Sequence, residues 1–549
     1  MVSQDKTAKV DFESLLRIFT VPEGPESTLT QIENSLSLNL NKFLKEHIVA
    51  EEKPLQEIEK DFKDSQLPET PSFVSEHTEH LLDTLVSHSV HTSSPSFIGH
   101  MTSALPYFLM PLSKIMIALN QNLVKIETSK AFTPLERQVL GMLHNLIYTQ
   151  NDDFYAQWMH SAQHSLGTFC SGGTIANITA LWVARNNAFP AQGDFRGIER
   201  QGLFKALKHY NYEGVAVVVS ERGHYSLKKA ADVLGIGRES LIPVKTDDNN
   251  KVCLSDLKAK LVELESNRIK TIAVVGIAGT TETGNIDPLT EIAALCKTHH
   301  CHFHVDAAWG GATLMSNKHR HLLAGIELAD SVTIDAHKQL YIPMGAGMVL
   351  FKDPHSMASV EHHAAYILRK GSKDLGSHSL EGSRSGMAML LYSSMHIISR
   401  PGYELLINAG LDKARSFAQL IKQQADFELV TEPELCLLTY RYIPQHVKSA
   451  LQKAQGKQKR KLNDLLNGLT QFIQKHQRES GLSFVSRTTL TPKQWDNLTT
   501  TVFRVVLANP LTTDTILGNV LAEQREIAKA ALSLNKQIDV TVTAIESKM

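Results

Sequence analysis

The sequence has few cysteines and almost no excess of charge of either sign. Its 549 residues include five cysteines, none of them in a C-x-x-C pair, so neither a disulfide framework nor a thiol redox motif is expected. Lys and Arg number 56 against 57 Asp and Glu, a net charge of −1. Such a balance gives no general attraction to nucleic acid or to an anionic membrane. We therefore expect no nucleic-acid partner.

Long apolar runs are also missing. The most apolar stretch, 105–119, is interrupted by Pro106, Pro111, Ser113 and Lys114, whereas a membrane-spanning helix needs roughly 20 apolar residues in a row. The first ten residues are polar and lack the apolar core of a signal peptide. The chain is 42% hydrophobic and 21% charged, which is ordinary for a globular protein. We expect a soluble, cytoplasmic protein without a membrane partner.

The patterning changes twice along the chain. Residues 1–95 show helix-like patterns, for example at 36–43 and 51–63, and predict a helical N-terminal extension. Residues 96–399 then alternate amphipathic stretches, such as 255–265 and 289–299, with short apolar runs. The runs, which are candidate strands, are 215–219, 242–244, 271–276, 303–305, 331–334 and 348–351.

This alternation predicts a large α/β domain with a mostly parallel sheet, because helices that cover both faces of a sheet require strands that are apolar on both sides. The short loop before 348–351 suits an antiparallel strand. After Pro401-Gly402, residues 400–549 predict a small α+β domain, with strands at 428–430, 435–442, 484–488 and 501–507. The basic run 448–461 is either a phosphate-binding patch or, as we favour, a solvated helix face, since no aromatic residues are interleaved with it.

Three segments at predicted strand ends carry the candidate chemistry. The first is 167–174, Gly-Thr-Phe-Cys-Ser-Gly-Gly-Thr, which precedes a helical run at 175–185. Small residues at a helix N-terminus expose free N–H groups that bind anions. Ser171, Gly172, Gly173 and Thr174 are thus candidates for a phosphate site. The alternative is an ordinary Ser/Thr helix cap.

The second and third segments each supply one reactive side chain. Asp306 ends the apolar strand of 302–311 and is followed by small residues, although it is equally suited to cap the next helix. Lys338 ends the segment 331–338, one helix and one strand further on, although a surface lysine is the alternative. Adjacent parallel strands would bring the carboxylate and the amine to one edge of the sheet.

A phosphate site, a carboxylate and a lysine in this order predict pyridoxal 5′-phosphate (PLP) as the cofactor. The helix N-terminus would bind the phosphate, Asp306 would pair with the pyridine nitrogen, and Lys338 would form an imine with the aldehyde. Each of these elements is weak evidence alone, and their ordered combination is what favours PLP.

The same motifs make the chain similar to fold type I PLP enzymes, and more narrowly to the group II amino-acid decarboxylases. The resemblance runs from about 94 to about 392. It implies that Ala308 and His337 also contact the cofactor, that His224 in Ser-Glu-Arg-Gly-His-Tyr-Ser stacks on its ring, and that Thr280, with Thr281, lies beside it.

The resemblance also implies three roles toward substrate. Tyr366, in a Gly-, Ser- and His-rich stretch that suits a mobile lid, corresponds to a tyrosine that returns a proton to the substrate carbon. Arg384 corresponds to an arginine that binds a substrate carboxylate. His100 stands where glutamate decarboxylases carry a carboxylate-binding Gln, and Ser94 replaces the usual His of the substrate-access segment.

From the resemblance we predict an α-decarboxylase of a small acidic amino acid. The sequence is most similar to the bacterial aspartate 1-decarboxylases, which supply β-alanine for pantothenate and coenzyme A. A glutamate decarboxylase, another reaction such as transamination, and a non-catalytic PLP-fold partner protein are the alternatives. The resemblance further implies a homodimer with an active site at its interface, to which the partner subunit's tyrosine contributes.

A cluster of cysteines and histidines at 296–304 suggests a metal site, but we predict none. Alternation along the strand sends His302 and His304 to one face and Cys301 to the other, and the spacing matches no common zinc pattern.

Overall fold

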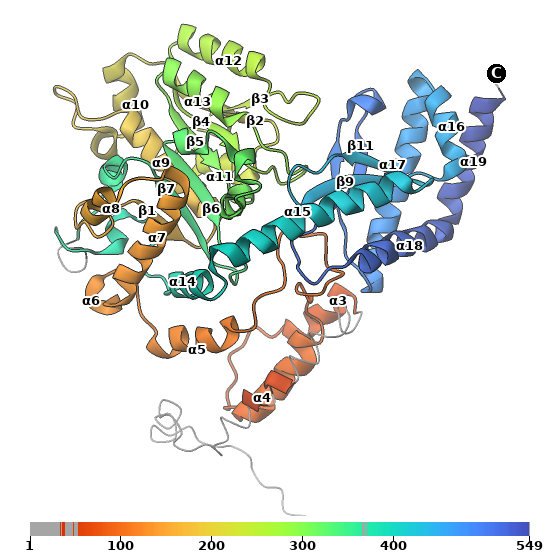
Figure 1. Cartoon of the computed structure of the whole chain (residues 1–549), viewed down its shortest axis with the longest axis horizontal. Coiled ribbons are helices and arrows are strands. Elements are labelled where there is room, and N and C mark those ends of the chain that lie inside the picture. Colours follow the sequence, from red (N-terminus) through yellow and green to blue (C-terminus); the bar gives the residue numbers. More distant parts are fainter. Residues whose placement is uncertain are drawn as a thin grey trace, which may run out of the picture.

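The computed structural model describes residues 53–364, 368 and 371–547, together with 33, 34, 36–38 and 48. Its centre is a seven-stranded sheet in the order β1-β7-β6-β5-β4-β2-β3 (Figure 1). The strands are β1 (Gly167–Cys170), β2 (Gly214–Ser220), β3 (Leu241–Val244), β4 (Ile269–Ile277), β5 (His302–Asp306), β6 (Ser331–Asp335) and β7 (Gly347–Phe351). β7 runs antiparallel to both of its neighbours, and the pairs among β2 to β6 are parallel. The predicted sheet, including its antiparallel member, is confirmed.

Helices cover both faces of this sheet, which explains why central strands such as β2 and β4 are mostly apolar. Val217, Val219 and Val275 pack into one core with α9 (Gly173–Ala188), α10 (Ile198–Tyr210) and α11 (Tyr225–Val233). Their strand neighbours Val218 and Val274 point the other way, into a second core with α7 (Phe132–Tyr148), α12 (Leu254–Ser266) and α13 (Leu289–Thr298). Strict alternation of side chains thus gives each strand two buried faces.

A second, antiparallel sheet lies in the C-terminal part of the chain, with the order β10-β11-β9-β8. Its strands are β8 (Phe427–Thr431), β9 (Leu437–Tyr442), β10 (Ser486–Leu490) and β11 (Thr500–Val506). Four helices accompany it, α16 (Gln445–Lys453), α17 (Gly456–Ser480), α18 (Asp514–Ala530) and α19 (Leu532–Glu546). The long helix α15 (Ser399–Gln423) runs from the large sheet toward this part (Figure 1). The fold class is therefore as predicted, and the domain boundaries at 95 and 400 stay predictions.

Pro401-Gly402 does not lie in a loop. It belongs to the first turn of α15, where a proline removes no helical hydrogen bond. The chain turns two residues before Pro401, at Ser399, the first residue of α15, whose φ is 62°. α14 (Ala388–Ile397) ends just ahead of this turn.

The described N-terminal segments are helical or extended. α3 (Leu55–Ile58) and α4 (Val74–Leu81) project below the large domain, near α5 (Leu109–Leu119), which lies along its lower edge (Figure 1). The short helices α6 (Ile126–Ser129) and α8 (Asp152–Trp158) flank α7. Most of the predicted helix at 36–43 falls outside the described residues. Among those described, no helix combines the length and apolarity that crossing a membrane requires.

Candidate active site

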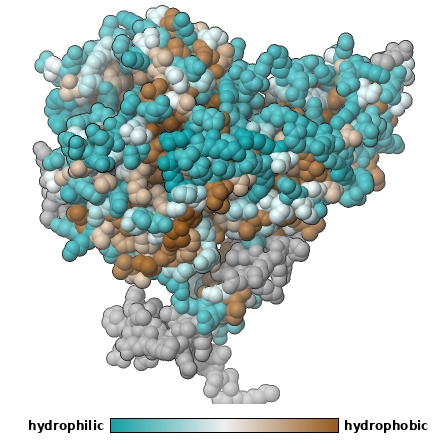
Figure 2. All heavy atoms as spheres, in the orientation of Figure 1, coloured by the Kyte–Doolittle hydropathy of each residue, from teal (hydrophilic) through white to brown (hydrophobic). Residues whose placement is uncertain are grey.

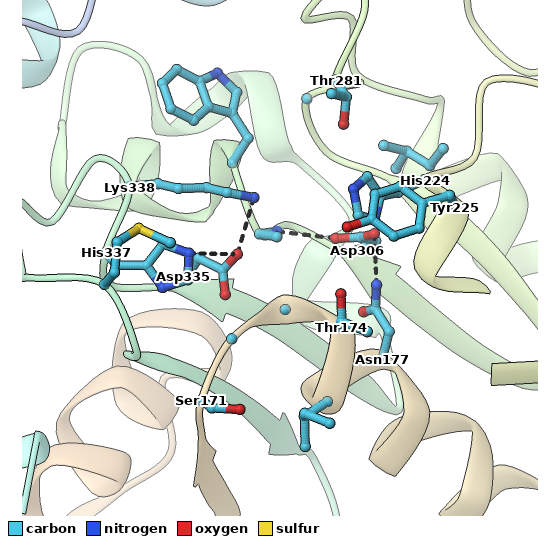
Figure 3. Close-up of a pocket in the computed structure, with 18 of the residues that line it drawn as sticks. Ser171, Thr174, Asn177, His224, Tyr225, Thr281, Asp306, Asp335, His337 and Lys338 are labelled. Atoms are coloured by element: carbon cyan, nitrogen blue, oxygen red, sulfur yellow. Dashed lines mark hydrogen bonds and ion pairs between the residues drawn. The ribbon is translucent and has the colours of Figure 1, made fainter. Parts of the chain in front are cut away.

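Residues that follow five strands of the large sheet line a cavity of about 320 Å³ (Figure 3). Of the residues predicted to contact a cofactor, those that line it are Ser171, Gly172, Gly173, Thr174, His224, Asp306, Ala308, His337 and Lys338. The loops after β1, β2, β4, β5 and β6 meet here because the carboxyl ends of parallel strands share one edge. The Lys338 amine and the Asp306 carboxylate approach the cavity from different strands (Figure 3).

The N-terminus of α9 forms one wall of the cavity. Gly172 precedes the helix and supplies no side-chain cap, so the N–H groups of its first turn are available for an anion. A side chain at Gly173 would place its Cβ 2.8 Å from Asp335 Oδ2 and 3.3 Å from Ala308 Cβ. Only glycine therefore allows this backbone to approach the end of β6. The N–H groups of this first turn could bind a phosphate, whereas the Ser171 N–H already donates to Glu381 Oε2 at 3.1 Å.

Asp306 is held in one orientation at the end of β5. Its Oδ2 accepts a hydrogen bond from Asn177 Nδ2 at 2.9 Å, and its Oδ1 accepts one from the Ala308 N–H at 3.2 Å. Only 6% of its surface is exposed. Two hydrogen bonds therefore hold this buried carboxylate in a fixed orientation toward the cavity.

Lys338 lies one turn beyond the end of β6. Its Nζ is 3.0 Å from Asp335 Oδ2. His337 donates through Nδ1 to the Ala346 carbonyl at 2.9 Å, and its Nε2 lies 3.6 Å from the same Asp335 oxygen. Burial lowers the pKa of His337, although Asp335 opposes this. Asp335 thus anchors the lysine side chain, whose amine remains at the cavity wall.

His224 caps α11 and faces the same cavity. Its Nδ1 accepts the Ser226 N–H at 3.3 Å and lies 2.8 Å from Ser226 Oγ. The acceptor role of Nδ1 leaves the proton of the neutral ring on Nε2. Burial lowers the pKa of His224. A neutral, fixed imidazole plane is what stacking on a flat cofactor requires.

The structure places two of the predicted residues away from this cavity. Thr280 is buried, and its hydroxyl is 2.8 Å from Thr283 Oγ1, whereas its neighbour Thr281 lines the cavity. Arg384 does not line the cavity either, because both of its Nη atoms are bonded to the carboxylate of Glu136. Glu136 thus occupies the guanidinium that was predicted to bind the carboxylate of the substrate.

His100 lies near the cavity without lining it. Its pKa is lowered by burial and by the charges of Arg504, Lys338 and His337, which places it within electrostatic range of the site. Its Nδ1 is 3.2 Å from Thr102 Oγ1. Tyr366 falls outside the described residues.

Sequence analysis missed Arg504, in the middle of β11. Its Nε donates to the Thr281 carbonyl at 2.6 Å and its Nη1 to the Gly99 carbonyl at 3.2 Å. Its Nη2 is buried without a hydrogen-bond partner among the described residues. Burial lowers the pKa of this guanidinium to about 10. The signal was a charged residue inside the apolar strand 501–507, because burying an arginine is costly unless it serves a purpose.

The histidines and cysteines at 296–304 do not converge. His302 and His304 both bond to Ser331 Oγ, at 2.8 Å each, whereas Cys301 Sγ contacts the Cys296 carbonyl. In the described part of the chain, no group of three His, Cys, Asp or Glu could hold a metal ion.

Comparisons with known proteins agree with this geometry. The family described as "Pyridoxal-dependent decarboxylase conserved domain" matches residues 54–443. Aspartate 1-decarboxylase from Aliivibrio fischeri is 72% identical over 531 residues, 97% of each chain. Acidic amino acid decarboxylase GADL1 from Xenopus tropicalis is 31% identical over 371 residues, 66% of this chain and 68% of that protein. The crystal structure of mouse CSAD aligns with a TM-score of 0.79 at 25% identity, covering 92% of this chain and 99% of that one.

The chain belongs to the family of pyridoxal-dependent decarboxylases. It is a carboxy-lyase, and its cofactor is PLP. The site fits that cofactor, since it combines an uncapped helix N-terminus beside a glycine that a Cβ would obstruct, a fixed carboxylate and a lysine amine in one cavity.

Proposed function

We propose that this enzyme removes the α-carboxylate of L-aspartate, releasing CO₂ and β-alanine. The observation that carries the proposal is the 72% identity to the Aliivibrio fischeri aspartate 1-decarboxylase over 97% of both chains. At that level a shared substrate is the simplest expectation. β-Alanine made in the cytoplasm would supply pantothenate and coenzyme A synthesis.

Bound PLP supplies an electron sink for the bond that breaks. Asp306 would pair with the pyridine nitrogen, and Lys338 would form the imine with the aldehyde. His224 would stack on the ring, and Ser171 to Thr174 would hold the phosphate. Tyr366, which we propose acts in the partner subunit's site, returns a proton to the substrate Cα.

Recognition of an acidic side chain needs a cation near the cavity, and Arg504 supplies it in our proposal. Its Nη2 has no hydrogen-bond partner among the described residues. Its Nε bonds to the carbonyl of Thr281, which lines the cavity, and its Nη1 bonds to the carbonyl of Gly99, the neighbour of His100. The planar guanidinium suits a carboxylate. We propose this role for Arg504 in place of Arg384, because Glu136 occupies Arg384.

Turnover of aspartate, glutamate, diaminobutyrate and tyrosine by the purified holoenzyme tests the proposal. We expect β-alanine from aspartate at a kcat/KM at least about tenfold above that for glutamate, since one methylene is worth about 1–3 kcal/mol in a pocket. Equal or faster release of GABA from glutamate would support the alternative. That alternative, an acidic amino acid decarboxylase of broader or glutamate specificity, is favoured by the 31% identity to GADL1.

A homodimer completes the proposal. α5 and the segment before it expose large apolar side chains that no described residue covers, including Tyr107, Met110, Ile115, Ile117 and Leu119. Figure 2 shows apolar spheres gathered at this lower edge of the molecule. An exposed apolar patch of this kind is typical of a subunit interface.

Light scattering of wild type and of Ile117→Lys tests the dimer, with Lys114→Ala on the same helix as the control. We expect a dimeric wild type and control, and a variant shifted to monomer with loss of turnover. A dimer that Ile117→Lys leaves intact at micromolar concentration would place the interface elsewhere.

A further inference from the structure

Asp306 is the end of a chain of hydrogen bonds that runs through the sheet to the surface. Its members, which we call the Asp306 relay, are Asn177 on α9, His304 and His302 on β5, and Ser331 on β6. Asn177 is 1% exposed, and His304 and Ser331 are 0% exposed. The relay lies outside the cavity except for Asn177, so neither the cofactor nor the substrate explains it.

The donors of the relay all point toward Asp306. An ionised carboxylate only accepts, so Asn177 turns its Nδ2 to Asp306 and its Oδ1 to His304 Nε2, 3.1 Å away. A carbonyl oxygen also only accepts, which puts a proton on His304 Nε2.

The hydrogen bonds beyond His304 have the same direction. Burial lowers the pKa of His304 to about 4, so the ring is neutral near pH 7 and its Nδ1 accepts the Ser331 hydroxyl proton at 2.8 Å. Ser331 Oγ in turn accepts from His302 Nε2 at 2.8 Å. The hydrogen bonds end at His302, whose side chain is 12% exposed; Asp330 Oδ2 lies 3.9 Å from its Nδ1, too far for a hydrogen bond.

Asn177 also connects the relay to the ring-stacking histidine. Its Nδ2 donates to Ser226 Oγ at 3.1 Å, which leaves the Ser226 proton for His224 Nδ1 at 2.8 Å. One amide therefore orients both the carboxylate and the imidazole that face the cofactor ring. Each buried hydrogen bond polarises the next, and together they fix the orientation of the Asp306 carboxylate.

We propose that the Asp306 relay holds Asp306 in the orientation in which it accepts from the cofactor's ring nitrogen, with His304, Ser331 and His302 as positioning residues. The proposal rests on the role given to Asp306 under the proposed function. The relay would explain the buried His304 and the partly buried His302, which neither a metal nor substrate binding explains.

The test compares binding of PLP with binding of 1-deaza-PLP, in which a carbon replaces the ring nitrogen, to the full-length apoenzyme. In Ser331→Ala the Kd of PLP should rise about tenfold, the equivalent of one hydrogen bond. The Kd of the analogue should be unchanged, because that ring has no nitrogen for Asp306 to hold. Thr313→Val, which removes another buried hydroxyl without a described partner, is the control and should affect neither ligand.

A second pair of variants guards against a folding defect at Ser331. His302→Phe removes the donor to Ser331 and should weaken PLP binding as Ser331→Ala does, whereas His302→Gln keeps an N–H donor and should restore it. In the holoenzymes of Ser331→Ala and His302→Phe, kcat should be lower than in the wild type, as the affinity for PLP is, while KM for the substrate stays unchanged. Equal losses for PLP and 1-deaza-PLP, or no loss for either, would overturn the relay.

Asp306→Asn separates this outcome from failure of the assigned role of Asp306. It should abolish the preference for PLP over the analogue. If Asp306→Asn keeps that preference, the role of Asp306 itself is wrong. If it loses the preference while the relay variants keep it, only the relay is wrong.

Discussion

The buried pair of Glu136 and Arg384 gives the sharpest test of which arginine serves the substrate. Glu136, on α7, is 0% exposed, and both of its oxygens bond to Arg384. Burial opposes the guanidinium charge, yet the neighbouring Glu136 outweighs it and raises the pKa of Arg384. Glu136→Gln would leave this charge buried without a counter-charge, at a cost of about 3–5 kcal/mol.

The cost can be expressed as a melting temperature of the apoenzyme. At about 2.1 cal/mol/K per residue, 549 residues give an unfolding entropy of about 1.2 kcal/mol/K, so the loss lowers Tm by about 3–4 °C. Arg384→Met should cost a similar amount. The double variant should recover part of it, because the Arg384 charge is removed with its partner, although the buried Arg137 also loses the charge of Glu136 and keeps that of Asp374. Calorimetry of the four proteins gives the coupling free energy directly.

Steady-state kinetics of the same four proteins decides the role of Arg384. If the pair is structural, KM for aspartate stays within about twofold in every variant that folds. A large rise of KM in Arg384→Met alone, with little change of Tm, would refute this reasoning and return Arg384 to the substrate.

Three further predictions concern the cofactor, the proton donor and acid stability. Lys338→Ala should abolish both steady turnover and the imine absorbance of the holoenzyme; a variant with full activity would refute its role. Tyr366→Phe should slow protonation of Cα and divert product to oxidative side reactions, which product analysis would detect; an unchanged product partition would contradict its role. Burial lowers the pKa of His144, His304 and His378 to about 4, against about 6.5 in an unfolded chain. Below pH 6.5 the unfolded state therefore binds protons that the folded state does not, so stability is full above pH 6.5 and falls toward pH 4, by up to about 3 kcal/mol for each histidine. Melting of the apoenzyme at pH 7.5 and pH 5 checks this, and equal Tm values would contradict it.

Sequence predicted the large sheet well because its signal is local. The run 215–219 is apolar on both sides, a property typical of strands covered by helices on both faces. The end of each strand then fixes where Asp306 and Lys338 must lie, since the sheet order brings β5 beside β6. Pro401 was harder to place, because a proline breaks a helix in its interior but is accommodated in its first turn.

The sequence did not predict the contacts of side chains whose partners are distant along the chain. Arg384 and Glu136 are 248 positions apart, and nothing local indicates that the one neutralises the other. Thr280 and Thr281 are neighbours of the same residue type, so the sequence does not indicate that Thr281 lines the cavity while Thr280 is buried away from it. Arg504 lies 223 positions from the Thr281 carbonyl that it binds, so only the packing of the second sheet against the first reveals it.

Charge balance around the cavity connects these placements to the choice of substrate. Two arginines near the site are paired with carboxylates: Arg222 with Glu282 at 2.8 Å, and Arg384 with Glu136. Arg504 instead donates to carbonyl and hydroxyl oxygens, which carry no formal charge. The charge of Glu282 acts on this guanidinium, but Glu282 is already paired with Arg222. In our proposal a substrate with a second carboxylate would bond directly to Arg504, whereas an amino acid with an apolar or basic side chain could not. The preference for an acidic substrate would then reflect the cost of leaving this buried charge without a direct partner as much as the hydrogen bonds that the substrate accepts.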